Sequence, residues 1–323
     1  MPKYVRVCQD WFPKGSYKGQ KEDGFLMWDL LKLQLDILLK NITRDWDFTI
    51  VISGQGEVRV GKSFLASQIG CYWVYQLEKL YGIKVKWNMD NFVLTGKDLI
   101  KRGNWLGTHY KYSPLVYDEA GADLEGRKVM TSMTRDVLDY YRECGQYNML
   151  NILVLPDFFD LPKGIALTRS IFLIDVYYIA TEEGIFERGY FNFYSKRNKK
   201  KLYLNGKKEL NYHVAPYDFN GQFPNVFTLN YEKYKKLKLE ALKKRESLKR
   251  NKFQIQRDAS WYLLAGEGLT CKKCGNEIKL TQEQLARRME NMTGIFVHQT
   301  TIGDALKRYG YEEQQKMEDK NKN

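Results

Sequence analysis

The sequence predicts an α/β protein whose mostly parallel sheet is extended by β-ribbons, with a small helical module near the carboxyl end. Over the first 180 residues, short apolar runs alternate with helical patterns, as expected of strands joined by crossover helices. One run, residues 47–54 (DFTIVISG), ends in glycine and leads through a glycine-rich loop into a helical pattern. A near-continuous apolar run of this kind is typical of a parallel strand buried on both faces.

Each element follows from a local pattern. The apolar stretch that begins at Phe25 is interrupted by charges at helical spacing, which predicts an amphipathic helix over residues 25–41. The helix after the glycine-rich loop is expected over residues 62–81, with its end at Gly82. The other elements of the sheet are expected as a strand–helix pair over 91–103, a helix over 129–144, and strands at 113–121, 152–155 and 170–180.

The pattern changes after residue 180. Residues 184–196 and 200–212 are expected to form antiparallel β-ribbons, with Asn205-Gly206 as a tight hairpin turn. The alternating aromatic residues of 190–194 are expected to form the packed face of a ribbon. Residues 231–257 carry eleven Lys and Arg against three Glu, which predicts a basic helical linker. The predicted organisation is an amino-terminal segment (1–44), an α/β domain with its ribbons (45–230), the linker (231–257) and a helical module (258–323).

Composition narrows the possible partners and compartments. A formal net charge of +13 in 323 residues favours a polyanionic partner, either nucleic acid or an anionic membrane surface, although a basic solvated surface is the alternative. The five cysteines are odd in number and form no repeating pattern, which favours a reducing compartment over a disulfide framework. The first residues lack the apolar core of a signal peptide, and charges interrupt the apolar stretch at 25–42, so a cytoplasmic protein is expected.

The loop at residues 56–63 reads GEVRVGKS and matches the phosphate-binding pattern GxxxxGK[ST]. In such a loop the backbone N–H groups turn inward around the phosphates, and the following helix adds its amino-terminal dipole. Lys62 would reach the β- and γ-phosphates of ATP, and Ser63 would ligate Mg²⁺. The residues expected to contact the nucleotide are Gly56, Glu57, Val58, Arg59, Val60, Gly61, Lys62, Ser63 and Phe64.

Two acidic residues follow the apolar run 115–117. Asp118 is expected to hold Mg²⁺ together with Ser63, and Glu119 to act as the general base that polarises the attacking water. This pair predicts hydrolysis, whereas two turn carboxylates that cap a helix are the alternative. Hydrolysis also needs a cation for the transition state. The candidates for a residue acting in trans are Arg127, Arg135, Arg142 and Arg169, with Arg59 as a further contact and Asp157 as a candidate polar sensor.

These motifs resemble the zonular-occludens-toxin-like and FtsK–HerA branch of the RecA-like P-loop ATPases, of archaeal or viral type. The resemblance covers residues 47–178 and includes GEVRVGKS, LVYDEAGADLEGR and the segment that ends NILVLPDFFDLPKGIALTRS. The chain departs from the branch at Pro156-Asp157, where many members carry glutamine or asparagine. The resemblance implies a homo-oligomer, in particular a hexameric ring, that moves double-stranded DNA with ATP for a virus or mobile element.

The carboxyl-terminal pattern at 280–311 predicts a helix-turn-helix module, winged-helix-like in size. Thr281 and Gln284 have the spacing of a capping box. A pair of protein-docking helices is the alternative. The expected nucleic-acid contacts are Lys243, Lys244, Arg245, Lys249, Arg250, Thr300, Thr301, Lys307 and Arg308. Cys271 and Cys274 have the spacing of half a zinc site, with an unliganded pair as the default because a second CxxC pair is missing from the sequence.

The leading functional hypothesis is an ATP-hydrolysing DNA motor for packaging, transfer or segregation. One alternative is a helicase-loader ATPase of the AAA+ type, which would place an asparagine sensor and a helical lid after the sheet. Another is a nucleotide-gated regulator in which the helix-turn-helix binds DNA and ATP switches the oligomeric state. A membrane-associated assembly ATPase is a further alternative, and it would call for a transmembrane helix.

Overall fold

A computed structural model describes residues 3–124, 132–247, 257, 260–261, 269–270, 277–278, 280–293 and 297–308. The chain divides into two compact units, Met1–Ala241 and Leu242–Asn323. The finer boundaries expected at residues 44, 230 and 257 stay predictions.

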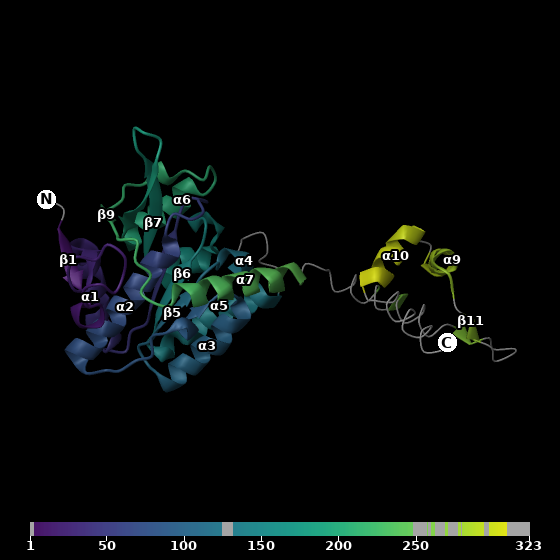
Figure 1. Cartoon of the computed structure of the whole chain (residues 1–323), viewed down its shortest axis with the longest axis horizontal. Helices are drawn as coiled ribbons and strands as arrows, with labels where there is room; N and C mark the ends of the chain where they lie inside the picture. Colours follow the sequence, from purple (N-terminus) through teal and green to yellow (C-terminus); the bar gives the residue numbers. More distant parts are fainter. Residues whose placement is uncertain are drawn as a thin grey trace. The chain divides into compact units, whose positions relative to one another are not determined.

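Within the described residues, the first unit is built on a seven-stranded sheet of order β4-β5-β6-β3-β7-β8-β9 (Figure 1). The strands are β3 (Phe48–Ser53), β4 (Phe92–Val93), β5 (Pro114–Tyr117), β6 (Leu150–Val154), β7 (Ser170–Ala180), β8 (Phe186–Tyr194) and β9 (Phe219–Gln222). Strands β4, β5, β6, β3 and β7 pair in parallel, whereas β7, β8 and β9 pair antiparallel. The predicted parallel sheet with an antiparallel extension is therefore confirmed.

Helices cover both faces of this sheet (Figure 1). Side chains alternate along β3, so that Ile50 and Ile52 join one core while Val51 joins the other. The first core lies under α1 (Asp29–Ile42) and α2 (Lys62–Tyr81). The second lies under α3 (Gly96–His109), α4 (Gly121–Leu124), α5 (Ser132–Glu143) and α6 (Lys196–Gly206). A last helix of the unit, α7 (Tyr231–Ser247), follows β9 and extends past Ala241.

The amino-terminal segment differs from the prediction. Phe25–Trp28 forms strand β2, which pairs antiparallel with β1 (Tyr4–Val7), and the helix begins only at Asp29. The reason is a period of two, because Phe25 and Met27 point into the first core while their neighbours stay half-buried. In the sequence, these four alternating residues could not be distinguished from the first turn of the helix that follows.

The second predicted ribbon is also wrong. Residues 196–206 form helix α6, and Asn205-Gly206 ends that helix instead of turning a hairpin. The buried positions 199, 202, 203 and 206 follow helical spacing, and they pack α6 onto the second core. The first ribbon is confirmed, since β8 spans Phe186–Tyr194 and buries Phe191 and Phe193.

The second unit contains two packed helices in its described part. Helices α9 (Gln282–Thr293) and α10 (Gln299–Arg308) share a small core with Trp261. The capping box at the start of α9 is confirmed, because the Gln284 N–H donates to Thr281 Oγ1 at 3.3 Å and the Thr281 N–H to Gln284 Oε1 at 2.9 Å. Strands β10 (Leu269–Thr270) and β11 (Glu277–Ile278) pair antiparallel. The assignment of a winged helix-turn-helix stays a prediction.

Within the described residues, no helix is both long enough and apolar enough to cross a membrane.

Candidate nucleotide site

The glycine-rich loop joins β3 to α2 at the carboxyl edge of the sheet. Gly61 has a φ of +105°, and the ring of Phe223 lies 3.2 Å from the position that a Cβ atom would take there. Only glycine adopts this conformation without strain, so the bend into α2 depends on it. At the other end of the loop, the N–H groups of Gly54 and Gly56 both donate to the carbonyl oxygen of Pro156, at 3.0 and 2.9 Å. The loop is thus fixed to the second residue after β6.

Lys62 is the first residue of α2, and its side chain folds back over the loop. The Nζ atom donates to the carbonyl oxygen of Glu57. Burial lowers the pKa of Lys62, while the Glu119 and Asp118 carboxylates oppose this shift. The ammonium group is thus bonded to the loop backbone and lies within electrostatic reach of Glu119 and Asp118.

The two residues expected to hold Mg²⁺ lie together although 55 positions separate them in sequence. Asp118 directly follows β5 and is only 2% exposed. Ser63 Oγ donates a hydrogen bond of 3.0 Å to Asp118 Oδ2. Burial raises the pKa of Asp118, whereas the nearby Lys238 ammonium group and the Tyr234 hydroxyl lower it. A buried carboxylate beside a serine hydroxyl is a set of hard oxygen ligands of the kind that Mg²⁺ prefers.

Glu119 has a left-handed backbone with a φ of +61°. Its N–H donates to Asp118 Oδ1 at 3.1 Å, which fixes the peptide between the two acids. Gln55 and Arg59, inside the phosphate loop, also have positive φ values of +53° and +61°. Such conformations cost free energy in residues other than glycine and concentrate at functional sites.

Helix α7 contributes two residues that the sequence analysis did not assign to the site. The Tyr234 hydroxyl donates to Asp118 Oδ2 and lies 3.0 Å from Ser63 Oγ. One turn further along, Lys238 Nζ lies 2.6 Å from Glu119 Oε1. The sequence does hint at packing here, because three aromatic residues at 227, 231 and 234 open an otherwise charged segment. The many lysines of the segment nevertheless favoured the prediction of a linker.

A third carboxylate lies on the other flank of β3. Asp175 on β7 is fully buried and accepts hydrogen bonds from Gln55 Nε2 at 2.5 Å and Ser53 Oγ at 3.3 Å. Burial raises the pKa of Asp175 to about 7, although these two hydrogen bonds oppose the shift. The sequence analysis did not single out this residue, since it stands inside an apolar strand.

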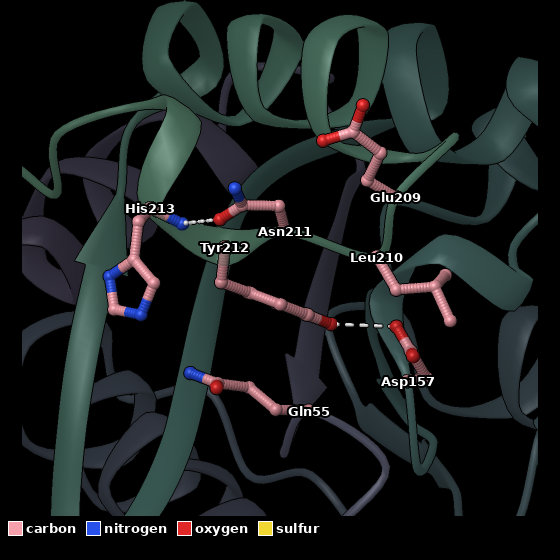
Figure 2. Close-up of a pocket in the computed structure, with 7 residues that line it drawn as sticks. All are labelled: Gln55, Asp157, Glu209, Leu210, Asn211, Tyr212 and His213. Carbon is pink, nitrogen blue, oxygen red and sulfur yellow. Dashed lines mark hydrogen bonds between the residues drawn. The ribbon is translucent and has the colours of Figure 1, made fainter.

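A polar cavity of about 510 Å³ lies beside the loop (Figure 2). It is lined by Gln55, Asp157, Glu209, Leu210, Asn211, Tyr212 and His213. The Tyr212 hydroxyl points at Asp157 and donates to its Oδ1 at 2.7 Å (Figure 2). The Phe159 N–H donates to the same oxygen at 2.9 Å. Asp157, the candidate sensor, thus lies in the same cavity as the loop residue Gln55, but two donors already occupy its Oδ1 atom.

The two main arginine candidates lie at the amino edge of the sheet, opposite the phosphate loop. Arg169 directly precedes β7, is three-quarters buried, and binds Asp47 with Nη1–Oδ1 at 3.2 Å. Arg142, at the end of α5, is 75% exposed and pairs with Asp139 at 2.7 Å. Of these two, Arg142 is the one whose side chain is exposed. Arg135 is exposed on α5, and Arg127 lies outside the described residues.

The predicted nucleic-acid and zinc residues are only partly described. Lys243 on α7 and Thr300 and Lys307 on α10 are exposed, and Thr301 is half-buried. Lys244 and Arg245 continue α7, and Arg308 ends α10. The remaining predicted residues, Lys249, Arg250, Cys271 and Cys274, lie outside the described residues. In the described part of the chain, no group of three or more His, Cys, Asp or Glu is placed to hold a metal ion.

Comparison with family models gives no match, and comparison with curated proteins gives none either. Several solved structures are similar. B204, the DNA-packaging ATPase of Sulfolobus turreted icosahedral virus, is 18% identical over 48% of this chain and 95% of its own, with a TM-score of 0.31. The amino-terminal domain of zonular occludens toxin from Neisseria meningitidis is 11% identical over 55% of this chain and 94% of its own, with a TM-score of 0.34.

The ORC2 protein of Aeropyrum pernix is also similar, at 11% identity over 95% of this chain and 73% of its own, with a TM-score of 0.35. These proteins include the toxin-like type that the sequence motifs resemble.

Proposed function

We propose that this chain hydrolyses ATP and uses the energy to move DNA. The observation that carries the ATPase part is the contact between Ser63 and Asp118, with Glu119 directly beside it. Ser63 lies at the start of α2, which follows β3, and the two acidic residues directly follow β5. In the sheet, β6 lies between β3 and β5. A phosphate loop, a metal ligand and a general base then face one another at the carboxyl edge of one sheet.

Mg²⁺ would be held by Ser63 Oγ and, through water, by Asp118. When bound, the ion supplies positive charge that neutralises the phosphate oxygens. Lys62 adds a second cation from within the loop, and the N–H groups around Gly61 together with the dipole of α2 orient the phosphates. Glu119 then accepts a proton from the attacking water, and an arginine of a neighbouring subunit, with Arg142 as the candidate, stabilises the transition state.

DNA is the proposed substrate because basic charge is concentrated in helix α7. Seven Lys and Arg stand against three Glu in α7, and the net charge of the chain is +13. Phosphate contacts of lysine and arginine supply most of the non-specific affinity of proteins for DNA. The exposed polar residues of α10, including Thr300 and Lys307, are of types that contact bases and phosphates. A ring of subunits, with six as the expected number, would complete the site.

The second candidate is a nucleotide-gated DNA-binding regulator. The small core shared by α9 and α10 favours it, since two short helices packed in this way form the recognition part of many repressors. In that case ATP would switch assembly, and turnover would be slow.

The test measures ATP turnover of the full chain with and without long double-stranded DNA, for wild type and Glu119→Gln. A motor is expected to show strong stimulation by DNA, and the substitution is expected to reduce turnover by about 10²- to 10⁴-fold, because it removes the general base. Glu183→Gln, on an exposed loop, is the matched control. Slow turnover indifferent to DNA, together with sequence-specific DNA binding, would favour the regulator and contradict the motor.

A further inference from the structure

Helix α7 is held against the nucleotide site by two sets of contacts. Its aromatic side packs on α2 and β4, with the Phe227 ring that precedes it 5.4 Å from Phe64 and 4.9 Å from Tyr234, measured between centroids. The Tyr234 ring also lies 5.9 Å from that of Phe92. Next to this aromatic cluster, Tyr234 and Lys238 extend their polar atoms to Asp118, Ser63 and Glu119. The two residues are four positions apart and therefore share one face of the helix.

The Tyr234 hydroxyl contacts both residues that would hold magnesium. It is within hydrogen-bond distance of both Ser63 Oγ and Asp118 Oδ2, and these two atoms are themselves 3.0 Å apart. Mg²⁺ needs oxygen ligands at about 2.0–2.1 Å in near-octahedral geometry, with several waters retained. A hydroxyl that donates its proton to Asp118 Oδ2 takes the place of a metal-bound water that would donate to the same oxygen, and it also contacts Ser63 Oγ, the direct ligand. Magnesium would therefore compete with Tyr234 for these two oxygens.

Lys238 acts on the proposed base. Its ammonium group pairs with Glu119 at 2.6 Å, with the two side chains 36% and 31% exposed. The ammonium group thus occupies Oε1, one of the two oxygens with which Glu119 would accept a proton from the attacking water. The carboxylates of Asp118 and Glu119 raise the pKa of Lys238 against the effect of burial, so the lysine stays charged in this position.

We propose that α7 is a self-inhibitory helix, which blocks the magnesium position with Tyr234 and the base with Lys238 and must leave before magnesium nucleotide binds. The proposal rests on the proposed function of the site. The competing class of ligand is a magnesium complex of a nucleoside triphosphate. Free nucleotide without the metal competes less with Tyr234. Its phosphates would contact the loop and Lys62, whereas Ser63 and Asp118 are the residues that would hold the metal.

The test measures binding of a fluorescent, non-hydrolysable ATP analogue to the full chain, once with excess Mg²⁺ and once with a chelator. The variants are Tyr234→Phe, which keeps the ring in the aromatic cluster, and Lys238→Gln. Tyr231→Phe and Lys235→Gln are the matched controls on the same helix, since Tyr231 packs on Phe64 and Lys235 pairs with Glu232. The Tyr234 and Lys238 variants are expected to bind the magnesium complex about tenfold more tightly than wild type, with little change in chelator.

A second readout follows the helix itself by hydrogen exchange. The magnesium complex of the analogue is expected to speed exchange of the α7 amides over residues 231–241 in wild type, and the analogue in chelator is not. Equal affinity in all variants, or slower exchange of α7 with the magnesium complex, overturns the inhibitory role. Weaker binding of the magnesium complex by Lys238→Gln also overturns it, because the lysine would then contact phosphate. If wild type and all variants fail to bind the analogue, the proposed function fails, and the inference fails with it.

Discussion

The phosphate loop and helix α7 contribute to the same cluster of side chains, but the sequence displays them very differently. The loop is a contiguous motif, and its spacing states which backbone groups and side chains face the phosphates. Tyr234 reaches Ser63 across 171 positions, from a segment whose composition predicts a basic helical linker. A local motif thus reveals the chemistry that a site supports, whereas the elements that control access to it are visible only after folding.

The largest expected effect is on nucleotide affinity, and it comes from a substitution in the phosphate loop. Lys62→Ala removes the ammonium group that would meet the β- and γ-phosphates, so nucleotide affinity is expected to fall by more than about 10²-fold, with or without Mg²⁺. Titration with the fluorescent analogue measures this. Lys84→Ala, an exposed lysine after the end of α2, is the control. Retained affinity in Lys62→Ala would contradict the assignment of the loop.

A smaller effect tests whether packing holds α7 in place. Phe227→Ala removes the ring that contacts Phe64, Phe92 and Tyr234, and it leaves the polar contacts of Tyr234 and Lys238 unaltered. The loss of apolar contact is expected to loosen α7 and to raise affinity for the magnesium complex several-fold, with a lower melting temperature. Phe227→Leu keeps most of the buried volume, so its affinity and melting temperature should lie between those of wild type and Phe227→Ala. Unchanged hydrogen exchange of α7 in Phe227→Ala would show that the polar contacts alone hold the helix.

The smallest effect concerns Asp175, on the flank of the loop away from α7. Its pKa is raised to about 7 in the folded protein from 3.8, so the folded state binds the proton more tightly than the unfolded state. The stability that this proton contributes is fully present below about pH 4 and is lost as the pH rises through about 7. Asp175→Asn imitates the protonated form and should flatten the pH dependence of unfolding between pH 4 and 8. Urea unfolding at several pH values checks this, with Glu183→Gln as the control; a slope equal to that of wild type would contradict it.

Much of the fold could be predicted from the sequence because periodicity is a local property. The apolar run of β3 and the buried spacing of α2 identified the central strand and its helix. The errors arose where two periods compete over a short stretch. Four residues of β2 preceded a helix with the same apolar character, and Asn205-Gly206 resembled a hairpin although the surrounding residues repeat at helical spacing.

The residues of the site also differ in how far local sequence patterns could predict them. The proximity of Ser63, Asp118 and Glu119 could be predicted because each stands at the end of a predictable element, and parallel strands bring their carboxyl ends to one edge. Asp175, Tyr234 and Lys238 could not, since their roles depend on which strand lies next to β3 and on where α7 packs. Burial, which raises the pKa of Asp175, leaves no local trace in the sequence.

The left-handed residues of the site have a consequence for how this protein can evolve. Gln55, Arg59 and Glu119 each keep a backbone conformation that costs about 1 kcal/mol or more, and all three border the nucleotide site. Glycine at any of them would relieve the strain, but at Gln55 and Glu119 it would also remove a side chain that bonds to Asp175 or Lys238. Selection for a more stable fold and selection for turnover therefore act in opposite directions at these positions, so that gains in heat resistance should accumulate elsewhere in the chain.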